Sequence, residues 1–168
     1  MRIHSPIAGV VLFLTACTTT PTPKPAAEPP AEILSSTTAT GPDGMVITDE
    51  MIGRRSGEMS LTRTAGGESY GWSQMAPVKV GGGFDSGAER TYRFLNTLRG
   101  PNGEDVHYDR VGTCCPFTSP NSPFEGGGAL LEVYEVSYKG MAGKRRLYFD
   151  WYDEAEMMIP KGLTAAAH

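Results

Sequence analysis

Two adjacent cysteines, Cys114 and Cys115, carry the most distinctive chemistry in this sequence. They lie in the run Gly-Thr-Cys-Cys-Pro-Phe, which we place at the end of a strand and the start of a long loop through Gly128. Adjacent Cα atoms lie about 3.80 Å apart across a trans peptide bond, whereas disulfide-bonded residues usually lie roughly 4.4–6.8 Å apart. A bond between these neighbours would therefore be strained and comparatively easy to reduce. The pair is a candidate for a structural disulfide, two buried thiols, a redox switch or a metal-binding pair.

A metal site would need further ligands, and the sequence offers few of them near the cysteines. Zinc usually takes four ligands, and His107 is the single histidine between His4 and the terminal His168. Cys114, Cys115 and His107 therefore form an incomplete set, and we predict no metal and no cofactor. One internal histidine without a Gly-x-Ser-x-Gly elbow also gives no nucleophile triad. We assign no catalytic residue and expect a protein that is not an enzyme.

Aromatic side chains in a loop provide a second candidate site. Tyr70 and Trp72 stand two residues apart in a Gly- and Ser-containing segment, and exposed loop aromatics often form recognition surfaces. Such a pair more often folds back over the core, which is the interpretation we favour. With Lys79 and His107 added, these residues form the candidate ligand surface.

The N-terminal segment has the features of an export signal. Arg2 precedes an apolar run over residues 7–14, which is too short to span a bilayer because a spanning helix needs about 20 apolar residues. The run ends in Leu-Thr-Ala-Cys, which resembles the lipobox of bacterial lipoproteins, where the cysteine is acylated and becomes the mature N-terminus. We therefore predict a signal peptide over residues 1–16 and lipidation, such as palmitate, at Cys17. The family's sorting rule, with Thr18 in place of Asp, implies the inner leaflet of the outer membrane, facing the periplasm.

A change in composition separates this anchor from the folded part. Residues 17–44 are rich in Pro and Thr and have little to bury, which predicts a disordered linker. Residues 45–168 form a single predicted domain, consistent with a chain of 168 residues. The formal net charge of −4 provides no basic field for a phosphate backbone, so nucleic acid is excluded as a partner. The predicted oxidising compartment favours a disulfide between the two remaining cysteines.

The domain must be built from short strands and one helix. Apolar or alternating runs predict strands at residues 45–48, 58–62, 77–80, 106–111, 130–138 and 146–152. The turn at residues 140–143 predicts that the last two strands form a hairpin. In the last strand, Leu147 and Phe149 alternate with polar residues such as Asp150, which predicts one buried face and one solvent-exposed face.

The helix is predicted between a capping box and a stop signal. Ser86 and Glu89 have the spacing at which each side chain can satisfy a backbone amide of the other, and Gly100 precedes a proline. Apolar side chains fall on one helical face at Ala88, Tyr92, Leu95 and Leu98. The fold class predicted is α+β: a small antiparallel β-sheet with one main α-helix packed on it, preceded by the signal peptide and the linker.

Several short runs in this domain carry a resemblance. They are Tyr-Gly-Trp-Ser at 70–73, Pro-Val-Lys-Val-Gly-Gly-Gly at 77–83, Glu-Arg at 89–90, Gly-Thr-Cys-Cys-Pro-Phe at 112–117 and Tyr-Glu-Val at 134–136. Over residues 66–164 the chain resembles a family of small bacterial envelope proteins of unknown function, and Cys-Cys-Pro-Phe is the most specific part. The resemblance implies an envelope location and brings no activity, substrate or catalytic residue.

These observations lead to one expectation and two alternatives. We expect a membrane-anchored bacterial lipoprotein that acts as a non-catalytic binding or envelope-assembly module. Its partners would be the membrane, through the lipid, and an envelope protein or a small ligand. A thiol/disulfide redox protein that uses Cys114 and Cys115, and a metal-binding accessory protein, remain open.

Overall fold

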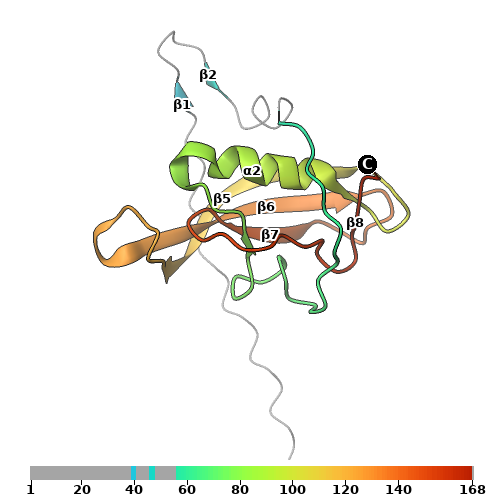
Figure 1. Cartoon of the computed structure of the whole chain (residues 1–168). Coiled ribbons are helices and arrows are strands. Elements are labelled where there is room, and N and C mark those ends of the chain that lie inside the picture. Colours follow the sequence, from blue (N-terminus) through green and yellow to red (C-terminus); the bar gives the residue numbers. More distant parts are fainter. Residues whose placement is uncertain (1–38, 41–45, 48–55, 168) are drawn as a thin grey trace, which may run out of the picture. The chain divides into compact units, whose positions relative to one another are not determined.

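The computed structural model describes residues 39–40, 46–47 and 56–167 (Figure 1). The predicted signal peptide, Cys17 and all of the predicted linker except Ala39–Thr40 lie outside these residues. Within the described ranges, no helix is long and apolar enough to cross a membrane. Strand β1 (Ala39–Thr40) pairs antiparallel with β2 (Val46–Ile47), so a strand lies within the predicted strand 45–48.

The main sheet has four strands in the order β3-β7-β6-β5. Its members are β3 (Val78–Lys79), β5 (Val106–Thr118), β6 (Gly128–Tyr138) and β7 (Arg145–Asp150). β6 pairs antiparallel with both β5 and β7, which confirms the predicted hairpin. β3 pairs parallel with β7, so the sheet is mixed rather than wholly antiparallel. A separate antiparallel pair joins β4 (Leu98–Arg99) to β8 (Thr164–Ala165).

Helix α2 (Gly83–Thr97), the longest helix in the described part of the chain, runs along one face of this sheet (Figure 1). Its buried side chains include Tyr92 and Leu95, as the helical periodicity predicts. Phe94 packs edge-to-face on Phe149 of β7 with ring centroids 5.7 Å apart, and Tyr92 packs on Tyr134 of β6 in the same way. The helix and the sheet therefore share one hydrophobic core, which confirms the α+β class.

The predicted capping box is wrong. The helix begins at Gly83, three residues before Ser86, and no side chain caps its N-terminus. The Gly82 backbone has φ 90°, a left-handed conformation that glycine adopts without steric cost. The Gly82 carbonyl accepts a hydrogen bond from the Ser86 amide at 3.1 Å, which closes the first turn before the predicted cap.

The strand predicted at residues 58–62 is also wrong. No strand forms there in the described chain, because the segment is held by side chains of α2 instead of a neighbouring strand. The Met59 amide donates to Thr97 Oγ1 at 2.8 Å, and Asn96 Nδ2 donates to the Ser56 carbonyl at 2.6 Å. Residues 56–59 therefore run beside the C-terminal end of the helix.

The predicted solvent-exposed face of β7 is wrong at one position. Leu147 and Phe149 are buried as predicted, but Asp150 is only 1% exposed. Strand β6, which pairs with both β5 and β7, has buried residues at six of the eight positions from Ala129 to Val136. These buried residues fall on both faces of the strand, so neither side of the sheet is fully exposed to solvent at β6.

Candidate functional site

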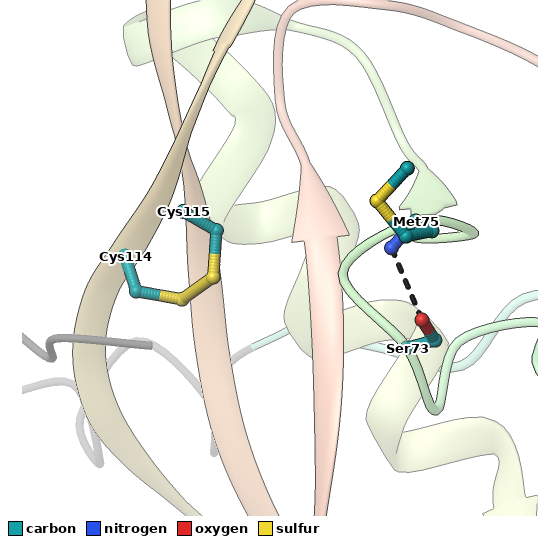
Figure 2. The surroundings of a disulfide bond; sticks show 4 residues. All are labelled: Ser73, Met75, Cys114 and Cys115. Carbon is teal, nitrogen blue, oxygen red and sulfur yellow. Dashed lines mark hydrogen bonds between the residues drawn. A yellow bond between two sulfur atoms is a disulfide. The ribbon is translucent and has the colours of Figure 1, made fainter. Parts of the chain in front are cut away.

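The two adjacent cysteines are joined in a disulfide within strand β5 (Figure 2). Residues 112–117 therefore do not begin a loop, because β5 continues to Thr118, beyond the predicted strand end at Val111. Successive side chains of a regular strand point to opposite faces, so bonded neighbours need an irregular backbone. A register shift lies between Cys114 and Phe117, and Cys115 has φ 60°. This bulge brings both sulfur atoms to one side.

The two cysteines differ in their surroundings. Cys114 is 1% exposed and lies opposite Leu131 of β6, so it belongs to the packed interior. Cys115 is half-buried and lines a pocket of about 390 Å³. The apolar wall of the pocket consists of Met75, Pro77, Cys115, Pro116, Phe117 and Leu131. Its polar lining consists of Gln74, Lys79, Thr118, Asp150 and Asp153.

The elements of the sheet bring this lining together. β5 supplies the disulfide, β6 supplies Leu131, and the end of β7 supplies Asp150. The turn before β3 supplies Met75, which is 82% exposed and whose amide donates to Ser73 Oγ at 3.1 Å (Figure 2). The pocket is therefore formed by four segments that are distant in the sequence.

Asp150 is the most deeply buried ionisable group of the pocket lining. Its Oδ1 accepts hydrogen bonds from the backbone amides of Tyr152 at 2.8 Å and of Asp153 at 3.1 Å. Burial raises the pKa of Asp150 above its ordinary value, and the nearby Asp153 charge acts in the same direction. These amide hydrogen bonds favour the ionised form but do not outweigh the burial.

Asp153 has the opposite electrostatic environment. Its Oδ1 accepts hydrogen bonds from Ser119 Oγ at 2.5 Å and Asn121 Nδ2 at 3.1 Å, and its Oδ2 pairs with Lys79 Nζ at 3.1 Å. The hydrogen bond from Ser119, followed by those from Lys79 and Asn121, holds the pKa of Asp153 below its ordinary value. Asp153 therefore carries a negative charge that Lys79 balances.

A row of aromatic rings leads away from the pocket. Phe117 lies 6.2 Å from Tyr152, Tyr152 lies 6.1 Å from Phe84, and Phe84 lies 5.9 Å from Phe124, all between ring centroids. Phe84 and Phe124 are 63% and 55% exposed. Two of the four rings in this row are therefore largely exposed to solvent.

The structure brings one residue of the predicted ligand surface to this pocket. Lys79 lines it, whereas Tyr70 and Trp72 pack against the core. Tyr70 Oη accepts a hydrogen bond from the Met158 amide at 3.1 Å, and Trp72 Nε1 donates to the Lys161 carbonyl at 3.0 Å. These contacts match the favoured interpretation of the aromatic pair as a cover over the core.

His107 is placed far from the cysteines. It is exposed and lies seven residues before Cys114 on the same strand, which at about 3.3 Å per residue is roughly 20 Å. The alternative metal set of Cys114, Cys115 and His107 is therefore not assembled. Among the residues that the structure describes, no group of three His, Cys, Asp or Glu side chains could hold a metal ion.

Sequence reasoning missed Asp150, Asp153 and Met75 as members of the site. One local signal for Asp150 exists, because an Asp that ends a strand often accepts hydrogen bonds from amides two residues further along. This local pattern predicts a turn at Tyr152, but it does not predict that Asp150 lines a pocket. Comparison of the chain with protein-family models, curated proteins and solved structures found no match.

Proposed function

We propose that this chain is a lipid-anchored, non-catalytic binding module of the bacterial envelope, related to the small envelope proteins that it resembles. The lipobox-like run at Leu14 to Cys17 supports an anchor at Cys17, with the domain facing the periplasm. The binding site is the pocket beside the Cys114–Cys115 disulfide, and its occupant is a small ligand or a protruding part of an envelope protein.

The observation that carries this proposal is the composition of the pocket. Ligand sites are typically concave, about 300–1,000 Å³ in volume, and mostly apolar with a few polar groups. The pocket of about 390 Å³ combines six apolar lining residues with the carboxylates of Asp150 and Asp153. Seven of the eleven lining residues belong to paired strands, so we expect little conformational entropy to be lost when a ligand binds.

A redox function is the second candidate, and one observation favours it. Cys115 lines the pocket, so an external thiol could enter and attack the disulfide. The attacking thiolate would form a mixed disulfide with one cysteine and release the other as a thiolate; a second external thiol would then complete the reduction. Non-catalytic binding is preferred because Cys114 is buried at 1% exposure, which restricts access to half of the bond.

The anchor is tested by expressing the full chain in a Gram-negative host with a labelled palmitate analogue. The unmodified chain should incorporate label and sediment with membranes, and Cys17→Ser should lose the label. Cys115→Ser is the matched control and should be labelled like the unmodified chain. Equal labelling of Cys17→Ser would contradict the anchor.

The pocket is tested with a fragment set and the full chain in detergent. Fragments that raise the melting temperature of the unmodified chain should have no effect on Gln74→Trp, whose indole would occupy the pocket. Glu89→Trp adds the same side chain on an exposed position of α2 and should respond normally. A Gln74→Trp response equal to that of the control would refute this binding site.

A further inference from the structure

We infer that the pocket beside Cys115 selects an organic cation, namely an ammonium or guanidinium group carried on an apolar stem. This inference rests on the proposed function, because it names the ligand class of the same site. The cation could belong to a free small amine or to a lysine or arginine side chain of an envelope protein. In both cases the chemistry of recognition is the same.

The charges of the pocket are unequal. Three charged residues line it, namely Lys79, Asp150 and Asp153. Lys79 Nζ lies 3.1 Å from Asp153 Oδ2, so these two charges balance each other. When Asp150 is ionised, the lining therefore has a formal charge of −1.

Asp150 is placed to act on a ligand in the pocket. It is 1% exposed as a residue, and it belongs to the pocket lining. The hydrogen bonds described above come from two neutral backbone amides, and both reach the same oxygen, Oδ1. The Lys79 charge also favours the ionised form of Asp150, but Lys79 is already paired with Asp153, so the buried Asp150 carboxylate is poorly compensated for the loss of water. A ligand cation would supply the missing positive charge where the local dielectric is low.

The apolar part of the pocket lining suits an apolar stem. Leu131, Pro77 and the disulfide surface at Cys115 offer no charge, and Phe117 adds an aromatic ring on which a cation can also pack. An anionic ligand would be repelled by Asp150 and would compete with Asp153 for Lys79. A neutral polyol would leave the charge of Asp150 uncompensated.

The experiment uses the full chain in detergent and measures dissociation constants by NMR titration. The probes are n-pentylamine, 1-pentanol and pentanoate, which share the same chain length and differ in the head group. We expect pentylamine to bind at least about tenfold more tightly than 1-pentanol, and pentanoate to bind more weakly than both.

Asp150→Asn should weaken pentylamine binding by about tenfold or more and leave 1-pentanol binding unchanged. Asp109→Asn is the matched control, since it removes the same charge from an exposed position on β5. It should change neither affinity. Because Asp150→Asn could disturb the fold, Gln74→Trp provides a second route: it retains the carboxylate, fills the cavity, and should abolish the binding of both probes.

A further pair of probes identifies the source of the cation. Nα-acetyl-lysine amide and its Nε-acetylated, neutral form differ in the side-chain charge alone. Preferential binding of the charged form supports a protein side chain, whereas binding of pentylamine without the lysine derivative supports a free amine.

Two failures are distinguishable. The cation inference would be overturned if pentylamine and 1-pentanol bound with equal affinity, or if Asp150→Asn weakened the binding of both equally. In either case the pocket would still be a binding site. If no probe changes the spectrum of the unmodified chain or of Gln74→Trp during titration, both the cation inference and the proposed function of this pocket would be overturned.

Discussion

Gly87 of helix α2 lies directly against the indole ring of Trp151. A Cβ atom built on Gly87 would stand 2.6 Å from Trp151 Cγ, which is closer than non-bonded carbon atoms approach. The ring is held in place because Trp151 Nε1 donates a hydrogen bond to Thr91 Oγ1 at 2.9 Å on the same helix. The absence of a side chain at Gly87 thus sets how closely the helix approaches the chain that follows β7.

Gly87→Ala should therefore destabilise the protein. Alanine in a helix interior is favoured over glycine by about 1 kcal/mol, but the overlap with Trp151 should cost more, with a net loss of about 1–3 kcal/mol. Urea unfolding measures the change in the free energy of unfolding. Gly128→Ala is the control, because its φ is −60° and no atom lies within 4 Å of its added Cβ. A Gly87→Ala variant as stable as this control would disprove the contact.

A largely buried ion pair joins strands β5 and β6 of the main sheet. Arg110 Nη2 lies 2.6 Å from Glu132 Oε2, and their side chains are 14% and 9% exposed. Arg110→Met should lower the free energy of unfolding by about 3–5 kcal/mol, because it removes the guanidinium that pairs with a buried carboxylate.

The double variant Arg110→Met/Glu132→Leu should recover most of this loss, since it removes both buried charges. A double-mutant cycle by urea unfolding measures the coupling. If the decrease in the free energy of unfolding of the double variant equals the sum of the decreases of the two single variants, the pair is not coupled.

The two pocket aspartates should give opposite pH dependences of stability. The folded-state pKa of Asp150 lies above its ordinary value of 3.8, so the folded chain holds this proton more tightly than the unfolded chain. Stability from Asp150 is therefore present below pH 3.8 and is lost as the pH rises through the folded pKa. For Asp153 the folded pKa is lowered, so its contribution is present above pH 3.8 and is lost as the pH falls.

Urea unfolding of the unmodified chain, Asp150→Asn and Asp153→Asn across acidic pH measures these dependences. Relative to Asp150→Asn, the unmodified chain should become less stable as the pH rises from about 4. Relative to Asp153→Asn, it should become less stable as the pH falls below that value. Slopes of the same sign for both comparisons would contradict the assigned environments.

The disulfide should be visible in the intact mass. The chain purified without reductant should be about 2 Da lighter than the dithiol form, and Cys114 and Cys115 should take up no alkylating agent. Reduction before alkylation should add two alkyl groups at these positions. Free alkylation of both cysteines without reductant would show that the bond does not form, and with it the second candidate function would be lost.

The helix and the strands around the hairpin were predictable because their signals are local. Side chains at the spacing of Tyr92 and Leu95 lie on one face of any helix, and the Gly-containing turn at residues 140–143 lies between two β-rich runs. The end of β5 was not predictable in this way. Glycine and two cysteines resemble the start of a loop, yet residues 112–118 continue the strand because β6 provides partners for most of them.

The sequence itself determines the features that depend on neighbours within a few residues. These are the adjacency of Cys114 and Cys115, the alternation of Leu147 and Phe149 with polar residues, and the apolar face of the helix. The pocket is decided by the tertiary structure alone. Lys79 meets Asp153 across 74 residues, and this depends on the parallel pairing of β3 with β7. Asp150 is a polar residue at a position that the local alternation predicts to be exposed, yet it is buried. Its burial results from long-range packing, because the segments that pack on each face of a sheet decide which residues are covered. The local alternation of residues does not contain this information.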